Sequence, residues 1–150
     1  NDHVRLSSSL SYNDAELDSD SPMITNIETG LMTFAPAGSQ LPGSRRWQMS
    51  NVITISNEIG GLPVSFSATH QYASSTITDF AVQAELGSYN LVDLRLDIAI
   101  SDTVNAGLFI NNVADNREAV LLNPAVAGFG PRQFIINRPR TVGLNLSIGF

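Results

Sequence analysis

Asp93, Arg95 and Asp97 stand at alternate positions of the otherwise apolar stretch YNLVDLRLDIAI. Alternate residues of a β-strand point to the same side, so the three charges share one face and the apolar residues between them share the other. Charges in the middle of a strand are costly against lipid and ordinary beside water or a polar protein surface. We expect an Asp–Arg–Asp ladder that satisfies its own charges, rather than a path for a substrate or a proton.

No set of residues with the spacing of a catalytic site accompanies these charges. His3 and His70 are far apart in the sequence, serine is abundant, and neither a nucleophile elbow nor a Ser-His-Asp arrangement is apparent. His70 has the parity of the apolar residues of its stretch, so we expect it at an interface rather than at a metal ion. The sequence predicts no enzyme activity, no metal site and no cofactor.

The acidic run NDAELDSD, residues 13–20, is a stretch whose side chains have the oxygen ligands that Ca²⁺ prefers. It lacks the glycine and the terminal glutamate of an EF-hand loop, so we expect a solvated loop instead. The chain has no cysteine, which excludes disulfides, thiolate metal sites and a cysteine nucleophile.

The composition favours a chain of alternating strands. Apolar residues make up 43% of the 150 residues and charged residues only 15%, against about a quarter charged in ordinary globular domains. No apolar run approaches the ~18 residues of a transmembrane helix, so the apolar residues are spread along the chain. The net charge is −6, and the eight cations, all arginines, form no extended basic patch, which argues against a nucleic-acid partner.

Six stretches alternate apolar residues with small or polar ones, which is the period of a strand between two different environments. They are residues 4–12, 47–56, 64–72, 92–100, 104–111 and 140–150. Ser8 and Asn51 interrupt the apolar side of the first and second stretches. The last stretch is the most regular, and its apolar side chains are Val142, Leu144, Leu146, Ile148 and Phe150.

The connections between these stretches alternate between long and short. Residues 13–46, 74–88 and 112–139 form three longer loops, whereas the turns at residues 58–63 and at Ser101-Asp102 are short. Inside the first loop we expect a short hairpin around residues 23–34. The alternation is typical of an antiparallel meander that spans a membrane, since a soluble sandwich more often has short turns at both ends.

Short turns on the periplasmic side place both ends of the chain there and the long loops outside the cell. Tyr12, Trp47 and Tyr72 then lie at the extracellular boundary, and all three have the apolar parity, as in an aromatic girdle at a membrane interface. The opposite face carries Ser, Thr, Asn, Gln and Gly. It also carries the charged residues that we expect to line a wet or plugged lumen: Arg5, Asp93, Arg95 and Asp97.

The second half of the chain resembles the C-terminal end of TonB-dependent outer-membrane receptors. The similar segments are YNLVDLRLDIAI, LFINNVADNREAV and INRPRTVGLNLSIGF, and LPGSRRWQMSNVITI upstream also resembles a strand entry of the family. The residues that match the family motifs are Asn111, Asn112, Asp115, Arg117, Pro139, Arg140, Thr141 and Gly143. The tyrosine that usually follows the Asn-Asn-Asp motif is missing, and Glu118-Ala119 stands at about its place.

The resemblance implies an all-β fold, an antiparallel transmembrane β-barrel of which residues 1–150 supply about six strands out of about 22. Family members also have an N-terminal plug, and neither a plug domain nor a TonB box is present in these residues. Six strands are too few to close a barrel, since the smallest have about eight. We expect a C-terminal barrel segment that further strands of the same receptor, or other chains, complete. A membrane-spanning hairpin at residues 23–34 would instead give eight strands and a closed barrel.

The resemblance also implies a function: uptake of a scarce ligand, of the siderophore, cobalamin or carbohydrate class, across the bacterial outer membrane. The implied partners are outer-membrane lipid, the remaining strands and plug, the TonB system and an extracellular small molecule that the loops capture. Leu146, Ile148 and Phe150 resemble the terminal signal that the outer-membrane assembly machinery reads. Two alternatives stay open, a small self-contained outer-membrane barrel with a structural or adhesive role and a soluble β-sandwich binding module.

Overall fold

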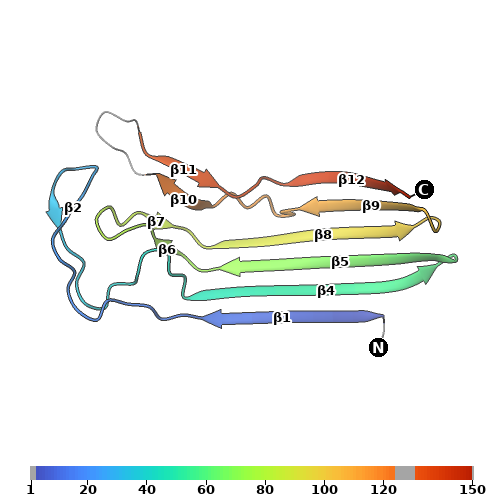
Figure 1. The fold of residues 1–150 in the computed structure, drawn as a ribbon, viewed down its shortest axis with the longest axis horizontal. Helices are drawn as coiled ribbons and strands as arrows, with labels where there is room; N and C mark the ends of the chain where they lie inside the picture. The colour runs from blue at the N-terminus through green and yellow to red at the C-terminus, as the bar shows by residue number, and fades with distance from the viewer. Residues whose placement is uncertain (1–2, 124–130, 150) are drawn as a thin grey trace.

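The main feature of the computed structural model is one antiparallel sheet of six long strands (Figure 1). The structure describes residues 3–123 and 131–149. The strands of this sheet, in spatial order, are β1 (Val4–Tyr12), β4 (Trp47–Ile59), β5 (Leu62–Ala73), β8 (Tyr89–Ala99), β9 (Val104–Asn111) and β12 (Thr141–Ile148). Their spatial order is also their order along the chain, so the sheet is a simple meander and the six predicted strands are confirmed. Within the described ranges, no helix is long and apolar enough to cross a membrane.

One hairpin is longer than the sequence predicts. Gly60 and Gly61 alone join β4 to β5. Both glycines have positive φ, 61° and 82°, which is the backbone of a two-residue hairpin turn of type I′. Glu58 and Pro63 pair across the two strands, so their assignment to the turn was wrong.

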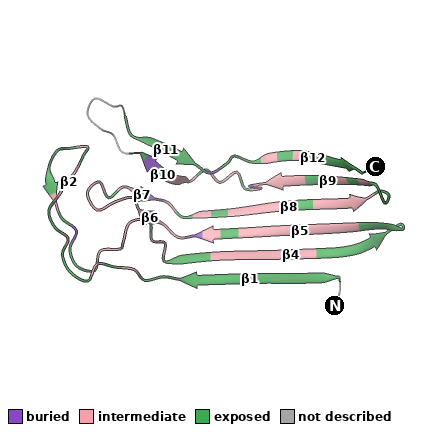
Figure 2. Cartoon of the chain, in the orientation of Figure 1, coloured by how far each residue is buried: buried purple, intermediate pink, exposed green. Residues whose placement is uncertain are grey.

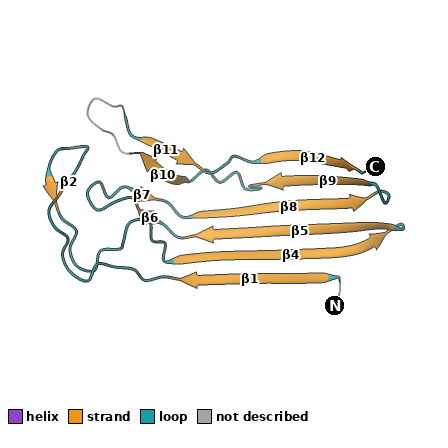
Figure 3. Ribbon diagram, viewed as in Figure 1, coloured by secondary structure: helices purple, strands orange, loops and turns teal. Residues whose placement is uncertain are grey.

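Three small hairpins lie at the end of the sheet opposite the tight turns (Figures 1 and 3). They are β2 (Ile24–Thr25) with β3 (Met32–Thr33), β6 (Thr76–Ile77) with β7 (Glu85–Leu86), and β10 (Ala119–Asn123) with β11 (Gln133–Ile136). The hairpin expected around residues 23–34 is present, but strands of two residues are too short to cross a bilayer. The alternative of a closed barrel of eight strands is therefore wrong for the described residues.

The two faces of the sheet differ along every strand. Because paired residues lie side by side, one row of side chains can be followed across all six strands. One such row is Val4, Ile55, Phe66, Leu96, Leu108 and Leu144. The next row, on the other side, is Arg5, Thr54, Ser67, Arg95, Phe109 and Gly143. We call the side of the first row the apolar face and the side of the second row the polar face.

The sheet has no hydrophobic core of its own. β1 is exposed along its whole length, and Leu6 and Leu144 on the two edge strands are 71% and 83% exposed. Apart from Gly107 in β9, the buried residues of the described ranges lie towards the loop end of the sheet (Figure 2), and the buried apolar ones are Ala35, Ala73, Leu86 and Leu122. A soluble sandwich needs a second sheet across the apolar face, and the described strands form none there. The sandwich alternative is therefore wrong.

Candidate functional site

The charges on the polar face of β8 are paired, but they do not form a ladder of three. The guanidinium of Arg95 donates two hydrogen bonds to the carboxylate of Asp97, from Nε to Oδ2 at 2.6 Å and from Nη2 to Oδ1 at 2.8 Å. Asp93 instead accepts a hydrogen bond of 2.7 Å from the backbone N–H of Asn112, just after β9. The predicted ladder is corrected in this respect, because Asp93 fixes the backbone after β9 rather than pairing with Arg95. Arg5 lies in the same row as Arg95, on β1.

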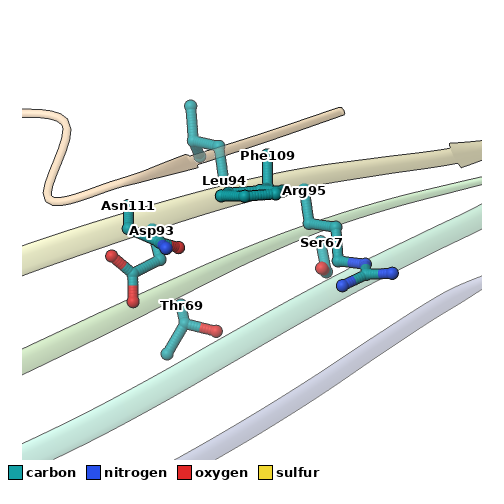
Figure 4. A pocket seen from close by; sticks show the side chains of 7 residues that line it. All are labelled: Ser67, Thr69, Asp93, Leu94, Arg95, Phe109 and Asn111. Carbon is teal, nitrogen blue, oxygen red and sulfur yellow. The ribbon is translucent and has the colours of Figure 1, made fainter. Parts of the chain in front are cut away.

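A shallow hollow of about 300 Å³ lies on the polar face beside these charges. Figure 4 shows the seven residues that line it, of which Leu94 alone has its side chain on the apolar face: Ser67, Thr69, Asp93, Leu94, Arg95, Phe109 and Asn111. Its polar groups are hydroxyls, an amide, a carboxylate and a guanidinium, which can form hydrogen bonds with a polar ligand or with a second protein surface. The described ranges contain no group of three or more metal-ligating side chains. The chemistry that the hollow supports is recognition.

Phe109 is the one large apolar side chain in the charged row of the polar face. Its ring covers Gly143 on the neighbouring strand, and a Cβ added to Gly143 would meet the ring at 2.3 Å. Gly107 makes similar room for Asp97, whose Oδ1 would lie 2.7 Å from an added Cβ. A ring that shields the bare backbone of a glycine pins the pairing of two strands. Sequence reasoning did not single out Phe109, since its parity only placed it with the small and polar residues of its stretch.

The residues singled out by the motif resemblance gather where β9 ends and β12 begins. Asn112 is only 4% exposed, and its φ is 51°. Its Nδ2 donates to the carbonyl oxygens of Asn116 and Arg138, both at 2.8 Å, and its Oδ1 accepts from the N–H of Asn116 at 3.0 Å. This buried amide therefore closes the long loop at its base by joining residues on both sides of it.

Asp115 also forms bonds at the junction where β9 ends and β12 begins. Its carboxylate forms an ion pair with Arg117 at 2.9 Å and accepts the backbone N–H of Arg140 at 2.9 Å. The hydrogen bond from Arg117, and then the one from Arg140, lower the pKa of Asp115, and the bond to Asp115 raises the pKa of Arg117. The other motif residues lie alongside: Asn111 pairs with Thr141, whose hydroxyl donates to the carbonyl of Pro139 at 3.1 Å.

Tyr12 and Trp47 form an aromatic pair at the loop end of the apolar face. They stand opposite each other in β1 and β4, with ring centroids 4.6 Å apart and planes tilted by 49°. Tyr72 stands opposite Met49, which lies two residues further from the loops than Trp47. The structure therefore brings the three predicted girdle residues to one end of one face.

The last strand presents its apolar side chains openly. Leu146 and Ile148 of β12 lie on the apolar face and are 65% and 56% exposed. Phe150, the third residue of the predicted assembly signal, lies outside the described residues.

Four polar side chains form a hydrogen-bonded line across the apolar face, and we call them the polar row: Ser8, Asn51, His70 and Asn90. The hydroxyl of Ser8 donates to Oδ1 of Asn51 at 2.6 Å, and Nδ2 of Asn51 donates to Nδ1 of His70 at 3.0 Å. Nε2 of His70 then donates to Oδ1 of Asn90 at 2.9 Å. Sequence reasoning noted the first three only as separate departures from the apolar pattern. Their common row follows from the strand register, which the sequence does not state.

The small hairpins above the sheet are tied to one another. In the first loop, Nδ2 of Asn26 donates to the carbonyl of Ala81 in the second loop at 2.9 Å. Glu28 receives a two-pronged hydrogen bond from Arg132 of the third loop, with Nε and Oε1 3.1 Å apart, and this bond raises the pKa of Arg132. The β2–β3 hairpin is therefore connected to both other loops.

The acidic run of the first loop is used within that loop. Asp14 and Glu16 form ion pairs with Arg46, and the Asp14 Oδ1 to Arg46 Nε distance is 3.3 Å. Asp20 accepts a hydrogen bond of 2.8 Å from the N–H of Ala37. The acidic residues are exposed, as expected of a solvated loop, and three of them also hold the loop in place through these bonds.

The six-stranded meander, with tight turns at one end and long loops at the other, has the fold of part of a large receptor-type β-barrel. Among solved structures, the chain is similar to the siderophore receptor PiuA from Acinetobacter baumannii, with a TM-score of 0.71 and 22% sequence identity. The match covers 99% of this chain and 20% of the PiuA chain, so the chain spans about a fifth of the length of that receptor. No family model matches the sequence, and no curated protein matches it. The predicted all-β antiparallel barrel fold is confirmed.

Proposed function

We propose that the chain is the C-terminal part of the barrel of a TonB-dependent outer-membrane receptor, which takes up a scarce ligand. One observation carries the proposal: an apolar row crosses all six strands, beside a mostly polar one, in a sheet that has the receptor-barrel fold and no core. In a barrel of this kind the apolar side chains face lipid and the polar ones face the lumen. The charges expected there are Arg5, Asp93, Arg95 and Asp97.

Two edges of the sheet need partners in this setting. β1 and β12 each pair on one side only among the described strands. A row of unpaired N–H and C=O groups is too costly in the hydrocarbon of a bilayer. We infer that both edges pair with further strands of the same receptor, which together enclose a plug.

We infer the direction of the strands from the difference between the two ends of the sheet. Tight turns in the periplasm place the start of β1 and the end of β12 there, and place the three hairpins outside the cell. Tyr12, Trp47 and Tyr72 then mark the extracellular boundary of the membrane. Leu146, Ile148 and Phe150 would present the terminal signal for barrel assembly at the periplasmic end.

The ligand that we propose first is a ferric siderophore, because PiuA is a siderophore receptor and this chain shares its fold over 99% of its own length. Cobalamin and carbohydrate ligands are the alternatives. The loops capture the ligand from outside, the hollow beside Arg95 faces the plug, and movement of the plug under force from TonB releases the ligand inward. The proposed role contains no catalytic step.

Two adjacent residues of β5 provide a matched test. Ser67 lies in the charged row of the polar face and Ala68 on the apolar face, and the chain has no other cysteine to interfere. In cells, Ser67→Cys is expected to react with a water-soluble maleimide that enters through the barrel. Ala68→Cys is expected to resist that reagent and to react with a lipid-soluble one. Equal labelling of both positions would contradict the barrel orientation.

Transport is tested separately in the organism that carries the receptor. Deletion of its gene is expected to abolish uptake of a radiolabelled ferric siderophore under iron limitation, and restoring the gene is expected to restore it. The same loss is expected when the TonB system is inactivated. Loss of cobalamin or carbohydrate uptake alone would move the proposal to those ligands, and a folded, heat-modifiable monomer of residues 1–150 in detergent would contradict the proposal that the chain is part of a larger barrel.

A further inference from the structure

The polar row is a continuous hydrogen-bonded line on a face whose other residues around it are apolar, Asn57 near the tight turn being a separate polar position. Asn51 Nδ2 and the Ser8 hydroxyl act as donors, and Asn90 Oδ1 is an acceptor. Because an amide NH2 group donates and an amide oxygen accepts, Nδ1 of His70 accepts from Asn51 and Nε2 of His70 donates to Asn90. Each of the four side chains therefore has a hydrogen-bond partner within the line.

The line lies just inside the aromatic boundary. Ser8 and Asn51 are each four residues from the aromatic pair Tyr12 and Trp47, and His70 is two residues from Tyr72. With about 3.3 Å per residue and a strand tilt of about 45°, these separations are depths of about 9 Å and about 5 Å. That is the level at which head groups of a bilayer give way to acyl chains. Asn90 stands directly opposite Tyr72, so the line reaches the aromatic level at β8.

The row keeps hydrogen-bonding capacity after its internal bonds are counted. The oxygen of Ser8 can still accept, and the Nδ2 group of Asn90 can still donate twice. The residues on the apolar face beside the row in the strand register carry no charge: Leu6, Ile53, Ala68, Leu10, Met49 and Tyr72. A phosphate would find no cation there, whereas neutral amide and hydroxyl groups would find both a donor and an acceptor.

We propose that the polar row binds the amide and hydroxyl groups of a glycolipid whose hydroxylated acyl chains are amide-linked, at the boundary between its head group and its chains. The proposal rests on the proposed function, because it requires the apolar face to lie in lipid. It explains why three strands carry a polar residue at the same row of a lipid-facing surface, where an isolated polar side chain is unfavourable.

The test uses the whole receptor that contains this chain, purified in detergent and examined by native mass spectrometry. The probes are lipid A, lipid A without its phosphates, and a phosphatidylethanolamine, each added at a series of concentrations. Both forms of lipid A are expected to bind with similar affinity and phosphatidylethanolamine at least tenfold more weakly. The double variant Asn51→Val with His70→Phe is expected to lose at least tenfold in affinity for both forms of lipid A.

Matched variants separate binding from folding. Thr69→Val changes the polar face one residue from His70 and is expected to leave lipid A binding unchanged. His70→Gln keeps one amide in place of the imidazole and is expected to lose about threefold, which provides a reading if the double variant fails to fold. Heat-dependent gel mobility checks folding in each case.

Three results would overturn the proposal: unchanged lipid A binding in the double variant, binding that requires the phosphates, or a change in receptor copy number without a change in lipid binding. A change in receptor copy number would instead indicate that the polar row contacts a second receptor. Failure of the proposed function is distinguished by the maleimide pair Ser67→Cys and Ala68→Cys, which reports the position of the apolar face independently of any bound lipid.

Discussion

The two faces of the sheet are made by neighbouring residues of the same strands, yet their chemistry is opposite. The row from Val4 to Leu144 is apolar on all six strands, and the adjacent row from Arg5 to Gly143 carries charges and hydroxyls. Neither face packs against a second layer of the described chain. The difference in chemistry between the two faces therefore points to two different surroundings outside the sheet. Strands of a transmembrane barrel, which lie between lipid and an aqueous lumen, have the same alternation.

The largest effect is expected from a charge placed on the apolar face. Leu94, in the middle of β8, shares a row with Leu6, Ile53 and Ala68. Leu94→Arg is expected to destabilise the folded receptor in lipid by about 2–4 kcal/mol, because the charge would lie deep in the hydrocarbon. Reversible denaturant titration in vesicles measures the change.

The control places the same charge on the other face. Thr69 stands directly opposite Asp93 on the polar face. Thr69→Arg is expected to change the stability by less than about 0.5 kcal/mol, the usual range for a polar surface position. Similar losses for both arginine variants would remove the distinction between the faces.

A smaller effect is expected where the polar face is tightly packed. Gly143→Ala would place a methyl group 2.3 Å from the ring of Phe109, and the ring must move. The expected loss of stability is about 1–3 kcal/mol, as for other overpacked positions. Asn145→Ala, on the same face of β12, is expected to have little effect in the same titration. The polar face would then tolerate a charged side chain at Thr69 but not an added methyl group at Gly143.

Adding Phe109→Ala to Gly143→Ala sharpens this reading. Removal of the ring relieves the clash, so the second substitution is expected to cost less in the presence of Gly143→Ala than in its absence. A double-mutant cycle measures this coupling, and strictly additive losses would show that the ring and the glycine act independently.

The smallest effect on stability is expected at Asp115, which lies at the junction of β9 and β12 rather than on either face of the sheet. The pKa of Asp115 is lowered by its bonds from Arg117 and Arg140, so its contribution to stability is present above its unfolded pKa, about 4. That contribution is lost as the pH falls through the folded pKa. Hydrogen exchange of the Arg140 amide, normalised to an unstructured peptide, is expected to speed up over this acidic range. Asp115→Asn is expected to abolish the pH step and Asp102→Asn, at a tight turn, to leave it intact.

Periodicity alone predicted the six strands and the two faces, because each strand borders two environments along its whole length. It placed the β4–β5 turn wrongly, since a proline and a charged residue resembled a loop although Gly60 and Gly61 suffice to turn the chain. It also found the short hairpin around residues 23–34 but not those in the other two loops, whose strands are too short for a pattern to show.

The alternation of apolar and polar residues could not predict contacts between residues that are far apart in the sequence. Asn112 and Asp115 were selected through the motif resemblance, but their bonds to Arg138 and Arg140 depend on how the long loop returns to the sheet. The polar row was visible only as isolated exceptions, because the alignment of Ser8, Asn51 and His70 depends on strand register. Register is a property of pairs of strands, and single-strand periodicity leaves it open.

The bonds between the hairpins bear on how the loop end of the sheet moves. Asn26 joins the first loop to the second, and the Glu28–Arg132 pair joins the first to the third. Loops linked in this way are expected to shift together as one body. A displacement of one hairpin would then reach the loop ends of strands at both edges of the sheet.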